Sequence, residues 1–182
     1  SIKKLEKFGE RLPLLAQADE LLDQVDQALG QHPHVHTDIR SQVQSVRNKS
    51  TMLRQFTVKE REKGASDQCA LSQTNLDQAL ASNKLGEIET KLKQSAVERE
   101  RLLESFDGTT VVAKLRSKEV ECGLTRSELK LELDAIQEYL WAIECVRSGT
   151  EANQYDRRVK FYQCGLDSFE EIRKEFGNSM LA

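Results

Sequence analysis

Apolar residues recur at steps of three and four along most of this chain, which is the spacing of side chains on one side of an α-helix. Turn-forming residues, among them Gly64, Gly149 and Gly165, interrupt the pattern and divide it into segments. Proline is favoured in the first turn of a helix, so Pro13 places the start of the first main helix near Leu12. We expect helices over 12–29, 37–63 and 66–106, and shorter ones over 110–121, 126–147, 155–165 and 168–176.

The composition agrees with long helices around a thin core. Of the 182 residues, 31% are charged and 5% aromatic, and the chain has only 2 prolines and 9 glycines. Long amphipathic helices have such a composition, whereas a domain with a thick core is richer in aromatic residues. The sequence therefore predicts an all-α fold. We expect an elongated antiparallel helical hairpin or coiled coil over 1–106, followed by a short helical bundle in a C-terminal helical region over 107–182.

The first two expected helices carry opposite charges. Residues 10–29 contain five acidic residues and one basic residue, whereas residues 37–63 contain seven basic and three acidic residues. Neighbouring helices joined by a short connection pack antiparallel most readily. We expect the charges to fix the register of this pair, because exposed ion pairs add only about 0.2–1 kcal/mol each.

The second and third expected helices have apolar seams about two residues wide per heptad. Helices with so narrow a seam are rarely stable alone, so we expect at least one seam to bind a helix of another protein. The expected partner-binding residues are Ile39, Val43, Val46, Leu53, Leu85, Ile88, Leu92 and Leu102.

The C-terminal third of the chain has a different composition. Seven of the ten aromatic residues lie in the last 45 positions, and Thr125 with Glu128 has the spacing of a capping box at the start of a helix. This part of the chain is the better candidate for a packed bundle. The expected bundle residues are Leu129, Leu133, Ile136, Leu140, Trp141 and Tyr162.

One cluster of residues could bind a metal ion. His32, His34 and His36 would share one side of an extended segment and could together meet a zinc or copper ion. A polar loop with solvated histidines is the favoured interpretation, because no cysteine or acidic residue converges on them in the sequence. We therefore predict no metal site. Metal binding by the three histidines stays the alternative, because the sequence does not decide between the two.

No catalytic, cofactor-binding or small-molecule substrate site is predicted. The sequence has no glycine-rich phosphate loop and none of the common hydrolase or metalloprotease motifs. A cysteine nucleophile would need a nearby base, and all three histidines lie in one short segment. The chain is therefore expected not to be an enzyme.

Charge and cysteine spacing bear on partners and compartment. The net charge of −3 does not favour nucleic acid, and membrane contact is expected to be absent or indirect, since no apolar run is long enough to cross a bilayer. Four widely separated cysteines in a helical chain make a disulfide framework unexpected, which favours a reducing compartment. We expect the cytoplasm, with the nucleus as an alternative. The cysteines are Cys69, Cys122, Cys145 and Cys164.

The order of features over residues 19–166 resembles the Mod(r) helical domain of ESCRT-I subunits, which joins the stalk and headpiece of that complex. An acidic helix leads through Pro33-His34-Val35 to a basic helix, and a long return helix ends at a phenylalanine-led turn at Phe106. The remaining matching residues are Arg47, Asn48, Leu53, Val111, Val112, Leu115, Tyr155, Arg157, Arg158 and Tyr162. The resemblance implies a non-catalytic subunit in endosomal sorting.

Taken from the residues alone, the sequence indicates a non-catalytic coiled-coil subunit or scaffold of a multi-protein assembly. It would bind partner helices through its seams, with a hetero-oligomer favoured and a homo-oligomer possible. The alternatives are the ESCRT-I-like role and a free-standing adaptor whose C-terminal bundle docks a peptide. Because the sequence does not begin with Met, we also expect it to be part of a longer protein.

Overall fold

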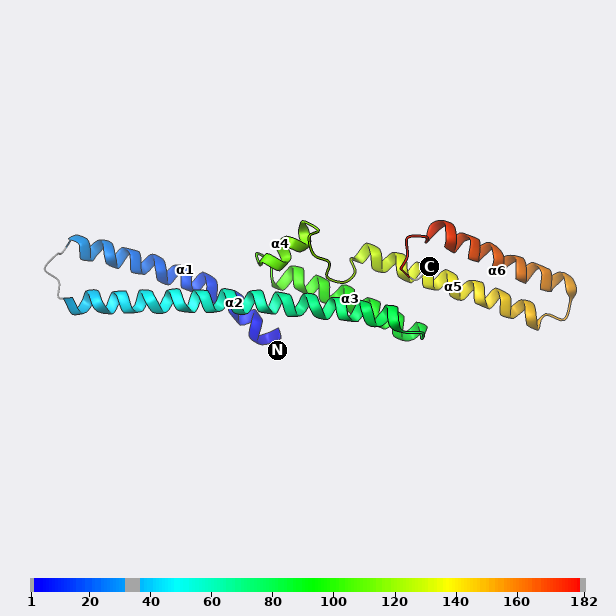
Figure 1. Cartoon of the computed structure of the whole chain (residues 1–182), viewed down its shortest axis with the longest axis horizontal. Coiled ribbons are helices and arrows are strands. Elements are labelled where there is room, and N and C mark those ends of the chain that lie inside the picture. The colour runs from blue at the N-terminus through cyan, green and yellow to red at the C-terminus, as the bar shows by residue number, and fades with distance from the viewer. Residues whose placement is uncertain (1, 32–36, 181–182) are drawn as a thin grey trace. The chain divides into compact units, whose positions relative to one another are not determined.

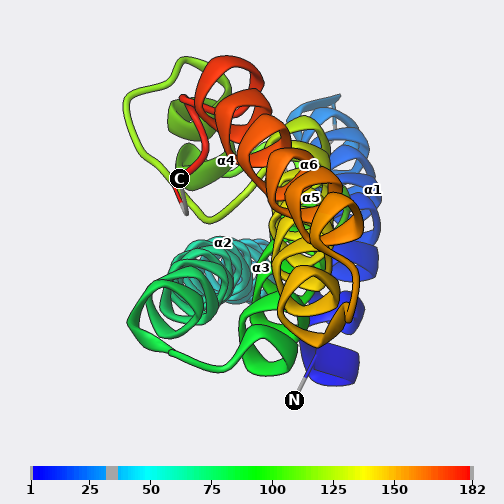
Figure 2. The ribbon, with the colours of Figure 1, turned by 90° about the vertical axis from the view of Figure 1, so that its right-hand side faces the viewer.

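The computed structural model describes residues 2–31 and 37–180, and within these residues it contains helices and no strand. The predicted all-α fold is confirmed. The six helices are α1 (Ile2–Gln31), α2 (Thr37–Ala81), α3 (Leu85–Ser105), α4 (Thr110–Arg116), α5 (Arg126–Glu151) and α6 (Tyr155–Glu175). Figure 1 shows α1 lying antiparallel to the first part of α2, and Figures 1 and 2 show α5 and α6 side by side.

The first two helices differ in length from the expected ones. α1 continues through Pro13, where we expected a turn and a new start. α2 is 45 residues long and continues through Gly64, where we expected a turn before a third helix. Ala65, beside that glycine, is fully buried, and the neighbouring Arg61 donates to the Asp107 carbonyl oxygen at 2.9 Å. Gly64 and Ala65 therefore lie where the segment near Asp107 packs against α2, and α2 does not end at these small residues.

The break between α2 and α3 falls inside the expected third helix. Residues 82–84 are not helical. The Ser82 hydroxyl accepts from the backbone N–H of Lys84 at 3.2 Å and donates to Glu87 at 3.0 Å. These bonds satisfy groups that a helix start leaves without partners.

Two helices begin at N-terminal caps, of which the one at Thr125 was predicted from the sequence and is confirmed. The Thr109 side chain accepts from the Val112 N–H at the start of α4. Thr125 and Glu128 form a complete capping box at the start of α5. These signals depend on a few consecutive residues, so the sequence alone is sufficient to find them.

The chain groups into two compact units. One contains Ser1–Gln68 and Arg101–Val120, and the other contains Cys69–Glu100 and Glu121–Ala182. The expected boundary at residue 107 thus lies inside a segment that belongs to the first unit. The second unit holds a small core to which α2, α3, α5 and the segment before α5 contribute. Its buried members are Leu76, Ala79, Ile88, Leu92, Ala96, Leu124 and Ile136.

All four cysteines are paired, contrary to the expectation of free thiols. Cys69 is joined to Cys122 with a Cα–Cα distance of 4.9 Å, and Cys145 is joined to Cys164 with a Cα–Cα distance of 6.0 Å. Sequence spacing could not show this, because an antiparallel arrangement of helices brings distant positions together. The pairing removes the argument for a reducing compartment.

Candidate binding surfaces

Ion pairs and hydrogen bonds align α1 with α2 in an antiparallel register. Arg47 of α2 contacts Asp23 at 2.9 Å and Asp26 at 2.5 Å. Arg54 contacts Asp19 at 2.6 Å, and the buried Ser50 hydroxyl donates to the same carboxylate at 2.7 Å. The hydrogen bond to Asp23, followed by the one to Asp26, raises the pKa of Arg47. The predicted pairing of the acidic helix α1 with the basic part of α2 is therefore confirmed.

These contacts also occupy basic side chains of α2. Arg47 and Arg54 bind carboxylates of α1, and Arg40 donates to the Leu29 carbonyl oxygen at 3.1 Å. These three arginines therefore bond to groups of α1, which makes them less available to phosphate groups.

The expected partner-binding residues of α2 lie along the edge of this hairpin. Val43 is half-buried, whereas Ile39, Val46 and Leu53 are 45–53% exposed. Phe56 continues the same side of the helix and is also half exposed. These apolar side chains are only partly covered by α1.

The other helix of the hairpin carries a matching stripe. Leu14, Leu21 and Val25 of α1 are spaced by seven and four residues and are 41–63% exposed. A hollow of about 280 Å³ lies between the two stripes. Its lining residues are Arg11, Leu14, Leu15, Leu53 and Thr57. Leu14 of the first stripe and Leu53 of the second both line this hollow, so the two stripes lie on the same side of the hairpin. We call this side the N-terminal apolar face, and its residues are Leu14, Leu21, Val25, Val46, Leu53 and Phe56.

The expected partner-binding residues of α3 are buried within the chain. Leu92 and Leu102 are fully buried and Ile88 is 7% exposed. Leu85 packs on the edge of the same core as Ile88 and Leu92. The seam on α3 is therefore an intramolecular packing surface. Ile88 and Leu92 lie in one core with residues of α2 and α5.

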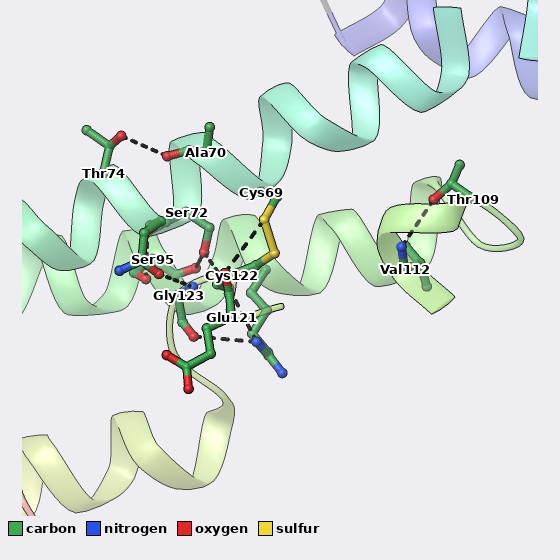
Figure 3. Close-up of a disulfide and its surroundings, with 12 residues drawn as sticks. Cys69, Ala70, Ser72, Thr74, Ser95, Thr109, Val112, Glu121, Cys122 and Gly123 are labelled. Atoms are coloured by element: carbon green, nitrogen blue, oxygen red, sulfur yellow. Dashed lines mark hydrogen bonds between the residues drawn. A yellow bond between two sulfur atoms is a disulfide. The ribbon is translucent and has the colours of Figure 1, made fainter. Parts of the chain in front are cut away.

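A buried polar clamp that sequence reasoning missed holds the segment before α5 (Figure 3). Ser72 of α2 donates to the carbonyl oxygens of Ser95 at 2.7 Å and of Cys122 at 3.2 Å. The Ser95 hydroxyl donates to the Ser72 carbonyl oxygen at 2.9 Å and accepts from the Leu124 N–H at 3.3 Å. The two hydroxyls thus satisfy backbone groups of three different segments.

Gly123 completes the clamp. Its φ angle is +67°, and an added Cβ would collide with the hydroxyls of Ser72 and Ser95. Only glycine meets both conditions without strain. The Cys69–Cys122 disulfide attaches the same segment covalently to α2 (Figure 3). Ser72 lies in a polar stretch that gave no signal of burial. Ser95, in contrast, stands seven residues from both Ile88 and Leu102, so its place on the apolar seam of α3 was a signal that it would be buried.

The expected bundle residues divide between a buried and an exposed part of α5. Ile136 is buried, and Leu129 and Leu133 pack against the core of the second unit. Leu140 and Trp141, in contrast, are 47% and 56% exposed. The stripe continues along α5, but α2 and α3 cover only its first turns.

Trp141 borders an open hollow of about 750 Å³ on α5. Apolar and acidic side chains share the lining, which consists of Asp134, Gln137, Glu138, Leu140, Trp141, Glu144 and Phe176. An aromatic face beside carboxylates favours a cationic group over an anionic one.

Close packing joins α5 to α6, and the two glycines that we expected to end helices are part of it. An added Cβ on Gly149 would lie 2.9 Å from the ring of Tyr162, and one on Gly165 would lie 2.8 Å from a Val146 methyl group. The Cys145–Cys164 disulfide lies in the same contact. Tyr162, expected in the bundle, is 39% exposed over Gly149.

Three further features bear on function: metal-binding groups, membrane-spanning helices and similarity to known proteins. Within residues 2–31 and 37–180, no group of three or more His, Cys, Asp or Glu side chains could hold a metal ion. The segment with His32, His34 and His36 lies outside the described residues. No helix in the described part of the chain is long and apolar enough to cross a membrane. No family model, curated protein or solved structure matches this chain.

Proposed function

We propose that this chain is a non-catalytic subunit or scaffold of a multi-protein assembly, and that it binds a helix of a partner protein on its N-terminal apolar face. One observation carries the proposal. Six large apolar side chains of the α1–α2 hairpin are 41–63% exposed, and one from each helix, Leu14 and Leu53, lines a common hollow. A contiguous exposed apolar surface on a soluble domain commonly marks a site of interaction.

The spacing of the face specifies the kind of partner. Leu14 and Leu21 on α1, and Val46 and Leu53 on α2, each repeat after seven residues. A third helix with apolar residues in the same repeat would complete a three-helix coiled coil, in which side chains of one helix fit between those of the other two. A partner helix bound there would cover the apolar side chains that α1 and α2 alone leave exposed to solvent.

The experiment is a comparison of partner binding by matched variants. Leu21→Lys and Leu53→Lys place a charge on the face at positions where a lysine remains solvated in the free protein. Leu80→Lys, at an α2 position that is 45% exposed in the other compact unit, is the control. We expect both face variants to lose the partner that the wild type and the control retain.

The partner must also be located on the chain. Cross-linked peptides should join the partner to α1 and α2, and hydrogen exchange in both helices should slow when it binds. A partner that the face variants retain, or that cross-links only to α5 and α6, would overturn the proposal.

A peptide-docking adaptor is a second candidate because of the hollow around Trp141. Exposed aromatic and apolar residues there stand beside Asp134, Glu138 and Glu144. A peptide with an arginine or lysine among apolar residues fits this combination. Loss of a basic peptide from Trp141→Ala, with binding on the N-terminal apolar face intact, would favour this candidate.

The paired cysteines bear on where either function takes place. Stable disulfides are found mainly in oxidising compartments, so we place the functional chain in such a compartment and not in the cytoplasm. This placement makes an ESCRT-I-like role the weaker alternative, since a cytosolic subunit would keep its thiols reduced. Thiol labelling of protein from its native source decides the question: full labelling without reductant would return the chain to a reducing compartment.

A further inference from the structure

The α5–α6 hairpin exposes a second apolar surface, separate from the one in the proposed function. On α6, large side chains repeat at steps of four and three and are 39–79% exposed: Tyr155, Val159, Tyr162, Leu166 and Phe169. On α5, Tyr139, Ile143 and Val146 are 36–45% exposed. We call these eight residues the C-terminal aromatic face.

Contacts between the helices join the two stripes. The rings of Tyr139 and Phe169 meet edge to face, with centroids 6.1 Å apart. Val146 packs on Gly165, next to Leu166. The two stripes therefore form one continuous surface along the hairpin.

We propose that this face binds the same face of a second copy of this chain, with the two α6 helices antiparallel. Three observations favour a second copy over a different protein: the area of the face, its symmetry and the distribution of charge along α6.

The area fits a stable dimer. With roughly 200 Å² for each large side chain when fully exposed, the exposed fractions of the eight residues amount to about 800 Å². A specific interface buries about 800 Å² on each partner. The face is therefore large enough to form the interface without any other part of the chain.

Four apolar residues of α6 are spaced symmetrically about Cys164: Val159, Tyr162, Leu166 and Phe169. An antiparallel copy centred near Cys164 places Val159 opposite Phe169 of the second copy, and Tyr162 opposite Leu166. Each pair joins a larger to a smaller side chain, which suits close packing across a two-fold axis. One face can thus serve both copies.

The two halves of α6 carry opposite net charges. Residues 155–160 contain three basic and one acidic residue, whereas residues 167–175 contain four acidic and two basic residues. Asp156 lies in the first turn of the helix, and Arg173 and Lys174 lie in its last turn. The antiparallel alignment brings Asp156 and Tyr155 of one copy next to Arg173 of the other. An ion pair and a contact between the guanidinium and the tyrosine ring both become possible there. A parallel arrangement would instead place like charges together.

The test compares the mass in solution of the oxidised chain, residues 1–182, with that of two variants. Leu166→Lys changes a residue that is 60% exposed on the C-terminal aromatic face, and Leu21→Lys changes one that is 61% exposed on the N-terminal apolar face. We expect a dimer for the wild type and for Leu21→Lys. Leu166→Lys should raise the dimer dissociation constant at least about 30-fold, as loss of a hot-spot residue does.

A charge reversal tests the orientation. Asp156→Arg and Arg173→Asp should each weaken the dimer, and the double variant should restore it, because the pair then forms with its signs exchanged. Helical circular dichroism must be the same for all variants. A wild type that stays monomeric up to roughly 100 µM, or a dimer that Leu166→Lys leaves intact, would overturn the proposal.

The design separates this inference from the proposed function. Leu21→Lys should lose the partner helix and keep the dimer, whereas Leu166→Lys should lose the dimer and keep the partner helix. Non-reducing electrophoresis should show a single chain in both cases, since the cysteines pair within one chain.

Discussion

Gly165 of α6 packs so closely on Val146 of α5 that an added Cβ would lie 2.8 Å from a Val146 methyl carbon and 3.3 Å from the Ala142 carbonyl oxygen. The backbone of α5 cannot move away without disturbing the helix. The absence of a side chain at residue 165 therefore sets the separation of α5 and α6.

We expect Gly165→Leu to lower the free energy of unfolding by about 1–3 kcal/mol, the usual cost of overpacking. Gly86, near the start of α3, is the matched control, because an added Cβ there meets nothing within 4 Å. Gly86→Ala should stabilise the chain by up to about 1 kcal/mol through helix propensity. Chemical denaturation followed by circular dichroism measures both. Equal effects of the two substitutions would show that residue 165 is not a close contact.

These glycines also show what the sequence could and could not predict. Thr125 and Glu128 were identified as a cap from four consecutive residues, and the charges of α1 and α2 predicted their pairing. Gly64, Gly149 and Gly165 were instead interpreted as stops. A glycine favours a helix end locally, but it also permits close approach of another segment. Only the three-dimensional arrangement decides between the two.

The candidate surfaces show the same limit. Heptad spacing located the apolar stripes on α2, α3 and α5, but it could not show which stripes the chain itself covers. Leu92 and Val46 have equivalent positions in their patterns, yet Leu92 is fully buried and Val46 is 51% exposed. The cysteine pairs and the buried serines were missed for a related reason, since both depend on contacts between distant segments.

The two disulfides should contribute unequally to stability. Cys69–Cys122 closes a sequence separation of 53 residues, whereas Cys145–Cys164 closes one of 19. In the chain-entropy treatment the longer loop corresponds to about 4 kcal/mol and the shorter to about 3 kcal/mol. The double variant Cys69→Ser/Cys122→Ser should therefore lose more stability than Cys145→Ser/Cys164→Ser. Denaturation of both variants in the absence of reductant measures the order, and the reverse order would contradict this account.

The clamp around Gly123 should position Cys122 for its disulfide. Gly123→Ala adds a methyl group against the hydroxyls of Ser72 and Ser95 and opposes the positive φ angle. We expect it to reduce the fraction of Cys69–Cys122 formed during oxidative refolding. Cys145–Cys164 should form normally and serves as an internal control. Alkylation followed by peptide mapping measures each pair, and equal loss of both would indicate general unfolding.

Arg126, at the start of α5, should make the attachment of that helix to α3 depend on pH. Its guanidinium binds the Glu100 carboxylate, with one hydrogen bond of 2.7 Å. The hydrogen bond from Arg126 lowers the pKa of Glu100 below its ordinary value of 4.5. Because the pKa of Glu100 is lower in the folded than in the unfolded chain, the ion pair stabilises the fold fully above pH 4.5. This stabilisation is lost as the pH falls through the lowered pKa.

Glu100→Gln should therefore reduce stability at neutral pH and have no effect in strong acid. Denaturation midpoints across this range, with Glu104→Gln on the same helix as the control, measure the difference. The effect should shrink in high salt, since Arg126 is 80% exposed; a difference between Glu100→Gln and wild type that persists in strong acid would assign it to packing and not to the ion pair.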